Sequence, residues 1–274
     1  MSKNILSNQG RRRNLTNPNE IIAEFEALNK LLSSHSDDIA TIYQEMDMLA
    51  NKLVSITKTT YDNMCVKYQE LRHDDLDELN QRLWDNFEHY IKTYINKPIN
   101  EIDMLDIGAG TGRDIMYAHK RGYKIIGIDN SDGFIKILES LCKEQRIPKG
   151  SYVKNDMRSL QFEDCSFDVI RHNASLLHLP IISFGYMADQ ALSEARRVLR
   201  DGGLLYIMVK KGDSLKFVDT GEGLGGRVFQ FYNHKMINDL VQRHGFTIIY
   251  TSDEYEERPS GCIEWISVIA QKGN

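Results

Sequence analysis

No apolar run in this 274-residue sequence reaches the length of about 18 to 20 residues that a membrane-spanning helix needs. The N-terminus also lacks the apolar core of a secretory signal. Cysteine is scarce, and no two of its positions form a CxxC pair: Cys65, Cys142, Cys165 and Cys262. This scatter argues against a disulfide framework and against a zinc site, and it favours a reducing compartment. We therefore expect a cytoplasmic protein without a bound metal.

An excess of positive charge is also missing, because the formal net charge is −5. This balance does not favour broad non-specific binding of nucleic acid, although it leaves room for one local basic patch. What is present is ordinary for a soluble globular protein, with 41% hydrophobic and 27% charged residues. The length suffices for one sizeable α/β domain with an appendage.

The N-terminal quarter divides into a tail and an apolar repeat. Residues 1–18 are polar and contain an arginine triplet at 11–13, so we predict a disordered tail with a solvated basic run. Residues 19–58 follow a strict 4-3 spacing that is typical of a coiled-coil seam. The seam positions are Ile21, Phe25, Leu28, Leu32, His35, Ile39, Ile42, Met46, Leu49, Leu53 and Ile56. The polar stretch 33–38 interrupts the seam, which leaves a helical hairpin open as an alternative.

We predict that this seam mediates self-association into a homo-oligomer, and the alternative is two amphipathic helices that pack on their own chain. His35 is then a polar residue that sets the register, since no partner ligand for a metal is near it in sequence. Residues 59–274 form the second predicted unit, which begins with helices over 60–71 and 74–94.

Strands then alternate with helices, which is typical of a mostly parallel sheet covered on both faces. Strands are predicted over 103–107, 124–129, 151–154, 167–171 and 203–209, and helices over 112–121, 132–145 and 187–199. The tail departs from this pattern. It contains a short strand at 229–232, a helix at 235–244 and strand-like runs at 248–251 and 263–270, of which the last two can pair as an antiparallel hairpin.

The most informative stretch is 102–113, which reads IDMLDIGAGTGR. A strand, a glycine turn and a helix in this order let the backbone approach a small ligand, and the helix N-terminus offers free N–H groups to an anion. Acidic Asp129 ends the next predicted strand, where a ribose diol needs a carboxylate acceptor. The spacing is GxGxG, and Arg113 stands where a dinucleotide site has its third glycine.

Five segments together carry a more specific resemblance. LDIGAGTGRD, GYKIIGIDNS, KNDMRSL, SFDVIRHNASLLHLP and EARRVLRDGGLLYI, between residues 105 and 207, resemble in order and spacing the motifs of class I S-adenosylmethionine-dependent methyltransferases. The resemblance implies S-adenosylmethionine as cofactor and a Rossmann-like sheet of seven mostly parallel strands with an antiparallel C-terminal hairpin. Ala109 replaces the cysteine or glycine that is usual in the first loop.

The resemblance also implies the residues that bind the methyl donor. The methionine end of the donor is expected to contact Asp106, Gly108, Ala109, Gly110 and Gly112. The ribose and the adenine are expected to contact Asp129, Asn130, Asp156 and Met157. Asn173 and Ala174 are expected to lie beside the sulfonium. Tyr61 and Tyr68 precede the core and resemble the residues that close the cofactor site in such enzymes. Plain core packing is the alternative for both tyrosines.

Methyl transfer from a sulfonium is an in-line displacement, so the protein mainly has to hold the acceptor at near-attack distance. A base is needed only where the acceptor atom carries a proton that must leave. His172 and His178 bracket the segment after the fourth predicted strand, and histidine titrates near neutral pH. We predict His178 as the base, because HLP resembles the substrate-facing loop of the family, and His172 as the second candidate. Ordinary packed residues are the alternative for both.

The substrate side is expected beyond the fifth predicted strand, because long loops at the carboxyl ends of strands carry it in such folds. Lys210 and Lys211 come first, and a glycine-rich loop at 221–226 leads to Arg227 and Tyr232. These four side chains can recognise a phosphate, a carboxylate or a sugar acid. A solvated basic pair is the alternative for the lysines.

Residues 226–249 resemble a segment of methyltransferase subfamilies that act on small molecules or glycans, so we predict methyl transfer to an O or N atom of such an acceptor. Residues 226–249 also resemble, more loosely, the wobble-uridine tRNA methyltransferases, so tRNA is the alternative acceptor. A third hypothesis is a non-catalytic methyltransferase-like subunit that recruits a partner through its coiled coil. The intact glycine turn and Asp129 count against it.

Overall fold

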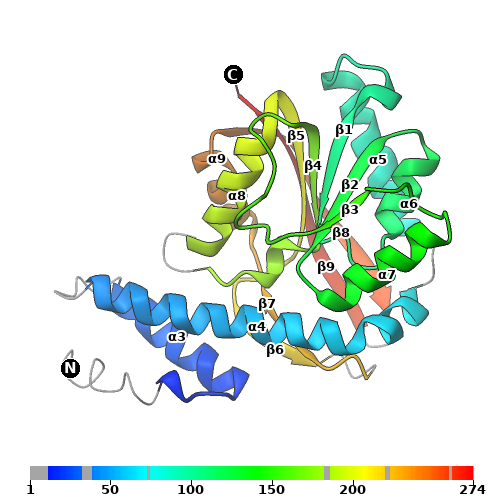
Figure 1. The fold of residues 1–274 in the computed structure, drawn as a ribbon. Coiled ribbons are helices and arrows are strands. Elements are labelled where there is room, and N and C mark those ends of the chain that lie inside the picture. The colour runs from blue at the N-terminus through cyan, green and yellow to red at the C-terminus, as the bar shows by residue number, and fades with distance from the viewer. Residues whose placement is uncertain are drawn as a thin grey trace.

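The computed structural model of the chain describes residues 12–32, 39–72, 75–181, 186–219, 223–258 and 261–273. It is built around a seven-stranded sheet with the order β3-β2-β1-β4-β5-β9-β8 (Figure 1). The strands are β1 (Asp103–Ile107), β2 (Lys124–Asp129), β3 (Tyr152–Lys154), β4 (Phe167–Asn173), β5 (Leu199–Lys210), β8 (Phe246–Arg258) and β9 (Gly261–Lys272). The pairs among β1 to β5 are parallel, whereas β9 runs antiparallel to both of its neighbours. The predicted fold class, including the C-terminal hairpin, is confirmed.

Helices cover both faces of this sheet, as Figure 1 shows. They are α5 (Glu78–Tyr94), α6 (Arg113–Lys120) and α7 (Asp132–Lys143) on one face, and α8 (Tyr186–Val198) and α9 (His234–Arg243) on the other. Strands that are covered on both faces have continuous apolar runs, and every residue of β4 from 167 to 172 is buried. The short 3-10 helices η1 (Ile99–Glu101) and η2 (Leu176–His178) lead into β1 and follow β4.

A second, two-stranded sheet lies outside the main one. It consists of β6 (Leu215–Asp219) and β7 (Gly226–Gln230), which pair in antiparallel fashion. The sequence prediction placed a short strand at 229–232 and missed β6 entirely. The β6 residues beyond Leu215 are exposed or half-buried, so their apolar pattern is too weak to indicate a strand.

The N-terminal extension is a pair of helices, α3 (Pro18–Leu32) and α4 (Ile39–Arg72). Seam residues from both helices face each other inside this one chain, and Leu28, Met46, Leu49 and Leu53 are all 0% exposed. The structure thus follows the alternative of packing in cis, and self-association through the seam stays a prediction that these buried residues do not support. His35 lies outside the described residues.

Helix α4 continues without a break past residue 58, where the sequence suggested the end of the extension. It runs beneath the carboxyl ends of the parallel strands (Figure 1) and contacts α7 and β7. The first turns of α4 therefore belong to the extension, while its last turns reach the main domain.

Residues 1–18 were predicted to be a disordered tail, but residues 12–18 pack against the extension. Arg12 is only 1% exposed, and its guanidinium forms an ion pair with Glu24 at 3.0 Å. The ammonium of Lys52 donates to the carbonyls of Arg12 and Leu15 at 3.0 and 3.1 Å. Both cations are paired with acceptors, which is why a polar segment can pack here. Residues 1–11 lie outside the described part.

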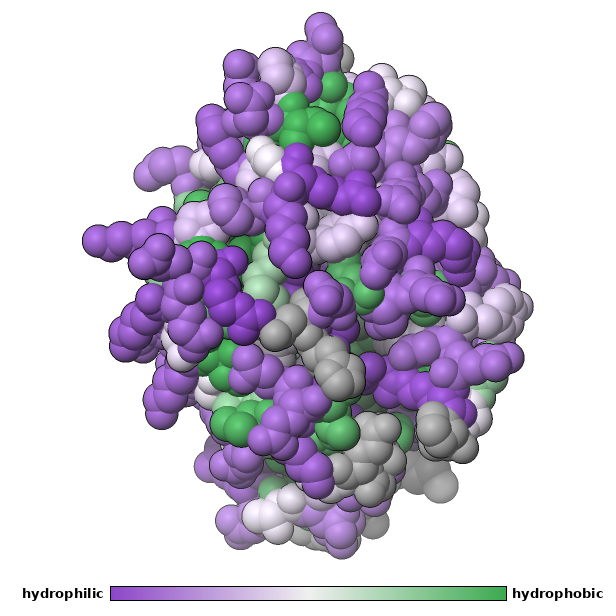
Figure 2. Space-filling view, turned by 90° about the vertical axis from the view of Figure 1, so that its right-hand side faces the viewer, coloured by the Kyte–Doolittle hydropathy of each residue, from purple (hydrophilic) through white to green (hydrophobic). Residues whose placement is uncertain are grey.

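The surface that Figure 2 shows consists mostly of hydrophilic side chains, and the hydrophobic ones form small, separate patches. None of the described helices combines the length and the hydropathy that crossing a bilayer requires.

Candidate functional site

A cavity of about 220 Å³ lies at the carboxyl ends of the parallel strands. Its walls come from the turn after β1, from the ends of β2, β3 and β4, and from α4. Ligands of open α/β sheets bind at this edge, because the loops that follow neighbouring strands meet there. The residues predicted for the methyl donor that line the cavity are Tyr61, Tyr68, Gly108, Ala109, Gly110, Asp129, Asn130, Asp156, Met157, Asn173 and Ala174.

The glycine turn brings backbone to the cavity surface. Gly108 has a φ of +85°, and a Cβ there would overlap the Cβ of Ser175. The N–H groups of Gly108 and Ala109 both donate to the carbonyl of Ile128, at 2.8 and 2.9 Å, which fixes the turn against β2. Gly112 precedes α6 and offers no side-chain cap, so the N-terminal N–H groups of α6 stay open to a ligand.

Asp129 ends β2 with its carboxylate fixed by backbone. One oxygen accepts the N–H of Gly110 at 2.9 Å, and the other accepts the N–H of Ser131 at 2.8 Å. Burial raises the pKa of Asp129 to about 6, while these backbone donors counteract the effect. Each carboxylate oxygen has more than one lone pair, so the side chain can accept further bonds from a ligand.

The end of β3 supplies a second polar group that the sequence prediction missed. Asn155 is buried and lines the cavity, and its Nδ2 has no hydrogen-bond partner among the described residues. Next to it, Asp156 forms an ion pair with Arg158 at 2.8 Å. Burial favours a higher pKa for Asp156, but the hydrogen bonds from Arg158 outweigh it and the pKa is lowered. Asp156 is therefore an ionised acceptor beside an unsatisfied amide donor.

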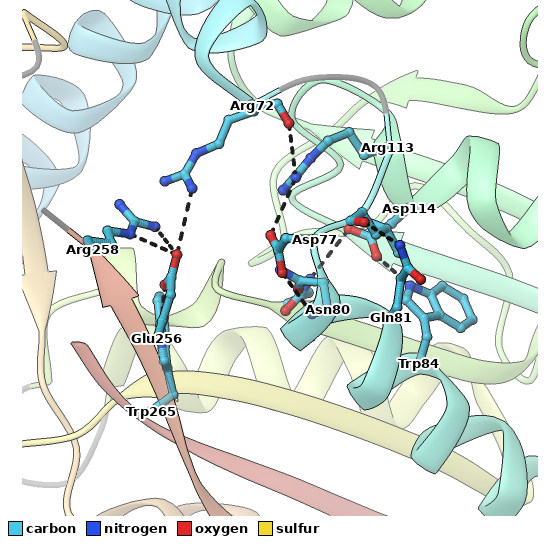
Figure 3. Close-up of polar contacts among 12 residues, drawn as sticks. Arg72, Asp77, Asn80, Gln81, Trp84, Arg113, Asp114, Glu256, Arg258 and Trp265 are labelled. Atoms are coloured by element: carbon cyan, nitrogen blue, oxygen red, sulfur yellow. Dashed lines mark hydrogen bonds and ion pairs between the residues drawn. The ribbon is translucent and has the colours of Figure 1, made fainter. Parts of the chain in front are cut away.

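Opposite the glycine turn lies a buried charge network around Arg171 of β4. Its guanidinium contacts Asp114 at 2.7 Å and Asp106 at 3.7 Å, and it lies 4.0 Å from the ring centre of Trp84. The indole N–H of Trp84 donates to Asp114 at 2.6 Å (Figure 3). Burial, reinforced by the charge of Asp114, raises the pKa of Asp106 to about 7.

This network changes which acidic residue faces the cavity. Asp106, predicted from the resemblance, is 2% exposed and is not among the cavity-lining residues, whereas Asp114 and Asn80 are. The amide of Asn173 lies 3.4 Å from both Asp114 and Asn80. Figure 3 shows Asn80 and Asp114 side by side, with Arg113 above them. Gly112 also lies outside the lining.

Two signals in the sequence could have found this network. Asp114 directly follows the glycine motif, and Arg171 is a cation within an otherwise apolar strand. A charge in a buried strand needs a buried partner.

Aromatic rings from α4 and α7 close one side of the cavity. The rings of Tyr61 and Tyr68 lie 6.0 Å apart, and each packs on Phe134, at 5.3 and 5.7 Å. The hydroxyl of Tyr61 lies 2.9 Å from Nε2 of His178. Tyr61, which was predicted to bind the cofactor, thus contacts His178, which was predicted to be the base.

His178 is held in one tautomer. Its Nδ1 lies 2.9 Å from the carbonyl of Val228, which can only accept, so Nδ1 carries the proton. Nε2 is then the acceptor for the hydroxyl of Tyr61. Burial lowers the pKa of His178 to about 3, and the charges of Arg227 and Lys210 contribute in the same direction.

His172 is fully buried and is not among the residues that line the cavity. Its Nδ1 lies 3.3 Å from the hydroxyl of Ser175, and burial lowers its pKa to about 3. The structure therefore brings His178, but not His172, to the site.

The four predicted substrate residues separate into two groups. Lys211 forms ion pairs with Asp253 at 2.8 Å and Glu264 at 3.3 Å, and Tyr232 is completely buried. Lys210 and Arg227 instead lie close to the wall of the cavity: the Nζ atom of Lys210 is 5.7 Å from the ring centre of Trp265, and the Cζ atom of Arg227 is 5.4 Å from that of Tyr61. None of the four lines the cavity itself.

Several further lining residues were missed because they come from distant parts of the chain. They are Arg72, and Glu256, Arg258 and Trp265 of the C-terminal hairpin. Figure 3 shows Glu256 between Arg72 and Arg258. No local motif marks these positions, because they meet only in the folded chain.

Comparisons with known proteins show similarity to methyltransferases. Residues 105–207 match the model of a family described as a methyltransferase domain. The sterol 24-C-methyltransferase of Candida albicans is 28% identical over 179 residues, which cover 61% of this chain and 45% of that protein. The demethylmenaquinone methyltransferase of Bacteroides fragilis is 31% identical over 157 residues, covering 54% of this chain and 57% of that protein. The chain thus spans about half the length of the curated relatives it matches.

Solved structures share the fold. A S-adenosylmethionine-dependent methyltransferase of Methanosarcina mazei has a TM-score of 0.56 at 23% identity, covering 67% of this chain and 97% of that one. A 1,6-didemethyltoxoflavin-N1-methyltransferase of Burkholderia thailandensis has a TM-score of 0.51 at 17% identity, covering 73% and 92%. The family match over residues 105–207, which spans β1 to β5, and this shared fold confirm the predicted resemblance of the chain to class I S-adenosylmethionine-dependent methyltransferases.

Proposed function

We propose that this chain transfers a methyl group from S-adenosylmethionine to an O or N atom of a small-molecule or glycan-type acceptor. The observation that carries the proposal is Asp129, whose carboxylate is held at the cavity edge by two backbone N–H groups. Two curated relatives named for a sterol and a demethylmenaquinone support a small-molecule acceptor.

The polar groups of the cavity fit the parts of the donor. Asp129 offers carboxylate lone pairs to the ribose hydroxyls. The unsatisfied amide donor of Asn155 and the carboxylate of Asp156 offer a donor and an acceptor to the adenine edge. At the other end, Asp114 and Asn173 offer acceptors to the ammonium of the methionine part.

When bound, S-adenosylmethionine supplies a methyl group on a positively charged sulfur atom. The residues of this chain then have to exclude water and orient the acceptor. The rings of Tyr61, Tyr68 and Phe134 serve the first task, since they form an apolar wall at the cavity.

Tyr61 and His178 serve the second task as a hydrogen-bonded pair. With its pKa near 3, His178 is neutral at physiological pH and keeps its Nε2 as an acceptor. The oxygen of Tyr61 can therefore accept a hydrogen bond from the acceptor group while its own proton points to His178. A hydroxyl oxygen that has just been methylated is an oxonium with a strongly acidic proton, so even this weak base suffices: Tyr61 takes that proton and passes its own to Nε2 of His178.

The test uses full-length protein, radiolabelled methyl donor and separated small-molecule, glycan and RNA fractions of a cell extract. We expect label in a small-molecule or glycan fraction. Label in RNA with a steep salt dependence of binding would favour the tRNA alternative instead. Absence of S-adenosylhomocysteine binding at millimolar concentration by calorimetry would refute the proposed function.

A further inference from the structure

Lys210 is the last residue of β5, and its side chain is largely buried. It is 9% exposed, and no hydrogen bond or ion pair from its ammonium is found within the described ranges. Instead the Nζ atom lies 3.9 Å from the ring centre of Phe229. An ammonium has three N–H donors, and burying it without acceptors costs free energy. This group therefore has unused capacity for an anion.

A second buried cation lies beside it. Arg227 is 5% exposed, and its Cζ atom is 5.4 Å from the ring centre of the same Phe229 and 5.4 Å from that of Tyr61. Burial lowers the pKa of Lys210 to about 8, and the charge of Arg227 is the next cause. Two cations that pack against the same ring favour a counter-charge near them.

Glu256, the acidic side chain whose charge raises the pKa of Lys210, is already engaged. Glu256 forms an ion pair with Arg258 at 2.6 Å and with Arg72 at 3.8 Å, and it accepts the indole N–H of Trp265 at 3.1 Å. Figure 3 shows Glu256 pointing to Arg72 and Arg258. Its charge is balanced locally, so the region around Lys210 keeps a net positive charge.

This cationic cluster, Lys210 with Arg227, adjoins the cavity. Lys210 lies two positions after Met208 on β5, and residues at this spacing share a face of the sheet. Met208 and Trp265 line the cavity, and the Trp265 ring centre is 5.7 Å from the Nζ atom. The ring of Phe229 lies 5.0 Å from that of His178, which also lines the cavity.

We propose that the methyl acceptor carries an oxyanion group, a carboxylate or a phosphate, which binds Lys210 and Arg227 beside His178. This inference rests on the proposed function and adds the class of substrate. Lysine and arginine form short, charge-assisted hydrogen bonds with oxyanions, and a guanidinium can hold one through two parallel bonds. The neighbouring rings of Phe229 and Trp265 would contact an apolar body attached to that group.

The test measures binding of three probes by calorimetry in saturating S-adenosylhomocysteine. The probes are benzoate, phenyl phosphate and neutral benzyl alcohol, so the first two distinguish a carboxylate from a phosphate. We expect wild-type protein to bind at least one anion at least tenfold more tightly than benzyl alcohol. Lys210→Met should lose that preference at least tenfold, and Lys210→Arg should keep most of it.

Lys216→Met is the matched control. Lys216 is also a lysine near an aromatic ring, 5.4 Å from that of Phe231, but it is exposed. We expect the Kd of Lys216→Met for the anions to stay within threefold of that of wild type. The inference is refuted if wild type binds the anions no better than benzyl alcohol, a result that does not depend on any variant folding. It is also refuted if Lys210→Met, shown to be folded by its thermal transition, binds them like wild type. Binding of S-adenosylhomocysteine, measured first, separates these outcomes from failure of the proposed function.

Discussion

Replacing Asp129 by alanine should weaken the binding of S-adenosylhomocysteine more than any other single change at the ribose end. The substitution removes a carboxylate that has lone pairs free for two hydroxyl groups. Hydrogen bonds to a charged group are worth about 1.5 to 3 kcal/mol each. Two such bonds at the low end amount to about 3 kcal/mol, which corresponds to an increase in Kd of about 100-fold.

Isothermal titration of full-length protein measures this change. The matched control is Asp164→Asn, which neutralises a carboxylate that is 74% exposed and pairs with Arg197 away from the cavity. We expect the control to bind S-adenosylhomocysteine within about twofold of wild type, because an exposed ion pair contributes little. If a folded Asp129→Ala protein binds within threefold of wild type, the assignment of Asp129 to the ribose is refuted.

The pH dependence of the same binding provides a second check. Burial raises the pKa of Asp129 to about 6, and only the ionised form accepts on both oxygens. The affinity for S-adenosylhomocysteine should therefore be highest above pH 7. Below pH 6 it should fall by up to about tenfold for each pH unit. Asp129→Asn has no such titration, so its residual affinity should lose this part of the profile. Asp106 keeps titrating in that variant, which separates the two groups.

Three further changes test other parts of the structure. Tyr61→Phe keeps the ring but removes the hydroxyl that donates to His178, so calorimetry should give a Kd for S-adenosylhomocysteine within threefold, while initial rates with the identified acceptor fall by about tenfold or more. Gly108→Ala forces a Cβ into Ser175 at a φ of +85°, so thermal unfolding should show a loss of about 2 to 4 kcal/mol. Leu49→Ala should cost about 2 to 5 kcal/mol of unfolding free energy, since Leu49 is 0% exposed in the helical pair, whereas its control Ile39→Ala, at a position that is 50% exposed, should change stability by less than about 0.5 kcal/mol.

The sheet and the part of the cavity assigned to the methyl donor could be predicted from the sequence, because both depend on patterns within short segments of the chain. The bounds of β1 and β2 were correct to the residue, because each is a buried apolar run that ends at an acidic residue or a glycine turn. The cavity-lining positions lie at strand ends: Gly108 directly follows β1, Asp129 ends β2 and Asp156 lies two residues after β3. Chain order alone places them together at one edge of a parallel sheet.

The N-terminal helices show where local pattern stops being sufficient. A 4-3 apolar spacing indicates that a helix buries one face. The spacing does not indicate whether that face packs against the same chain or against another one. The structure buries Met46 and Leu53 against its own chain. The length of the α4 helix was also not predictable, since its last turns change their partners from α3 to α7 and β7 without any break in helical spacing.

The charge state of the site is set by residues that are far apart in the chain. His178 has an ordinary sequence context, and its low pKa comes from burial and from Lys210 and Arg227, which reach it from β5 and β7. The same two cations form the proposed oxyanion site. An anion bound there offsets their charge, so the pKa of His178 should rise toward its ordinary value when the acceptor binds. The histidine then becomes a better base only in the complex that needs one, and an NMR titration of His178 with and without benzoate would measure the shift.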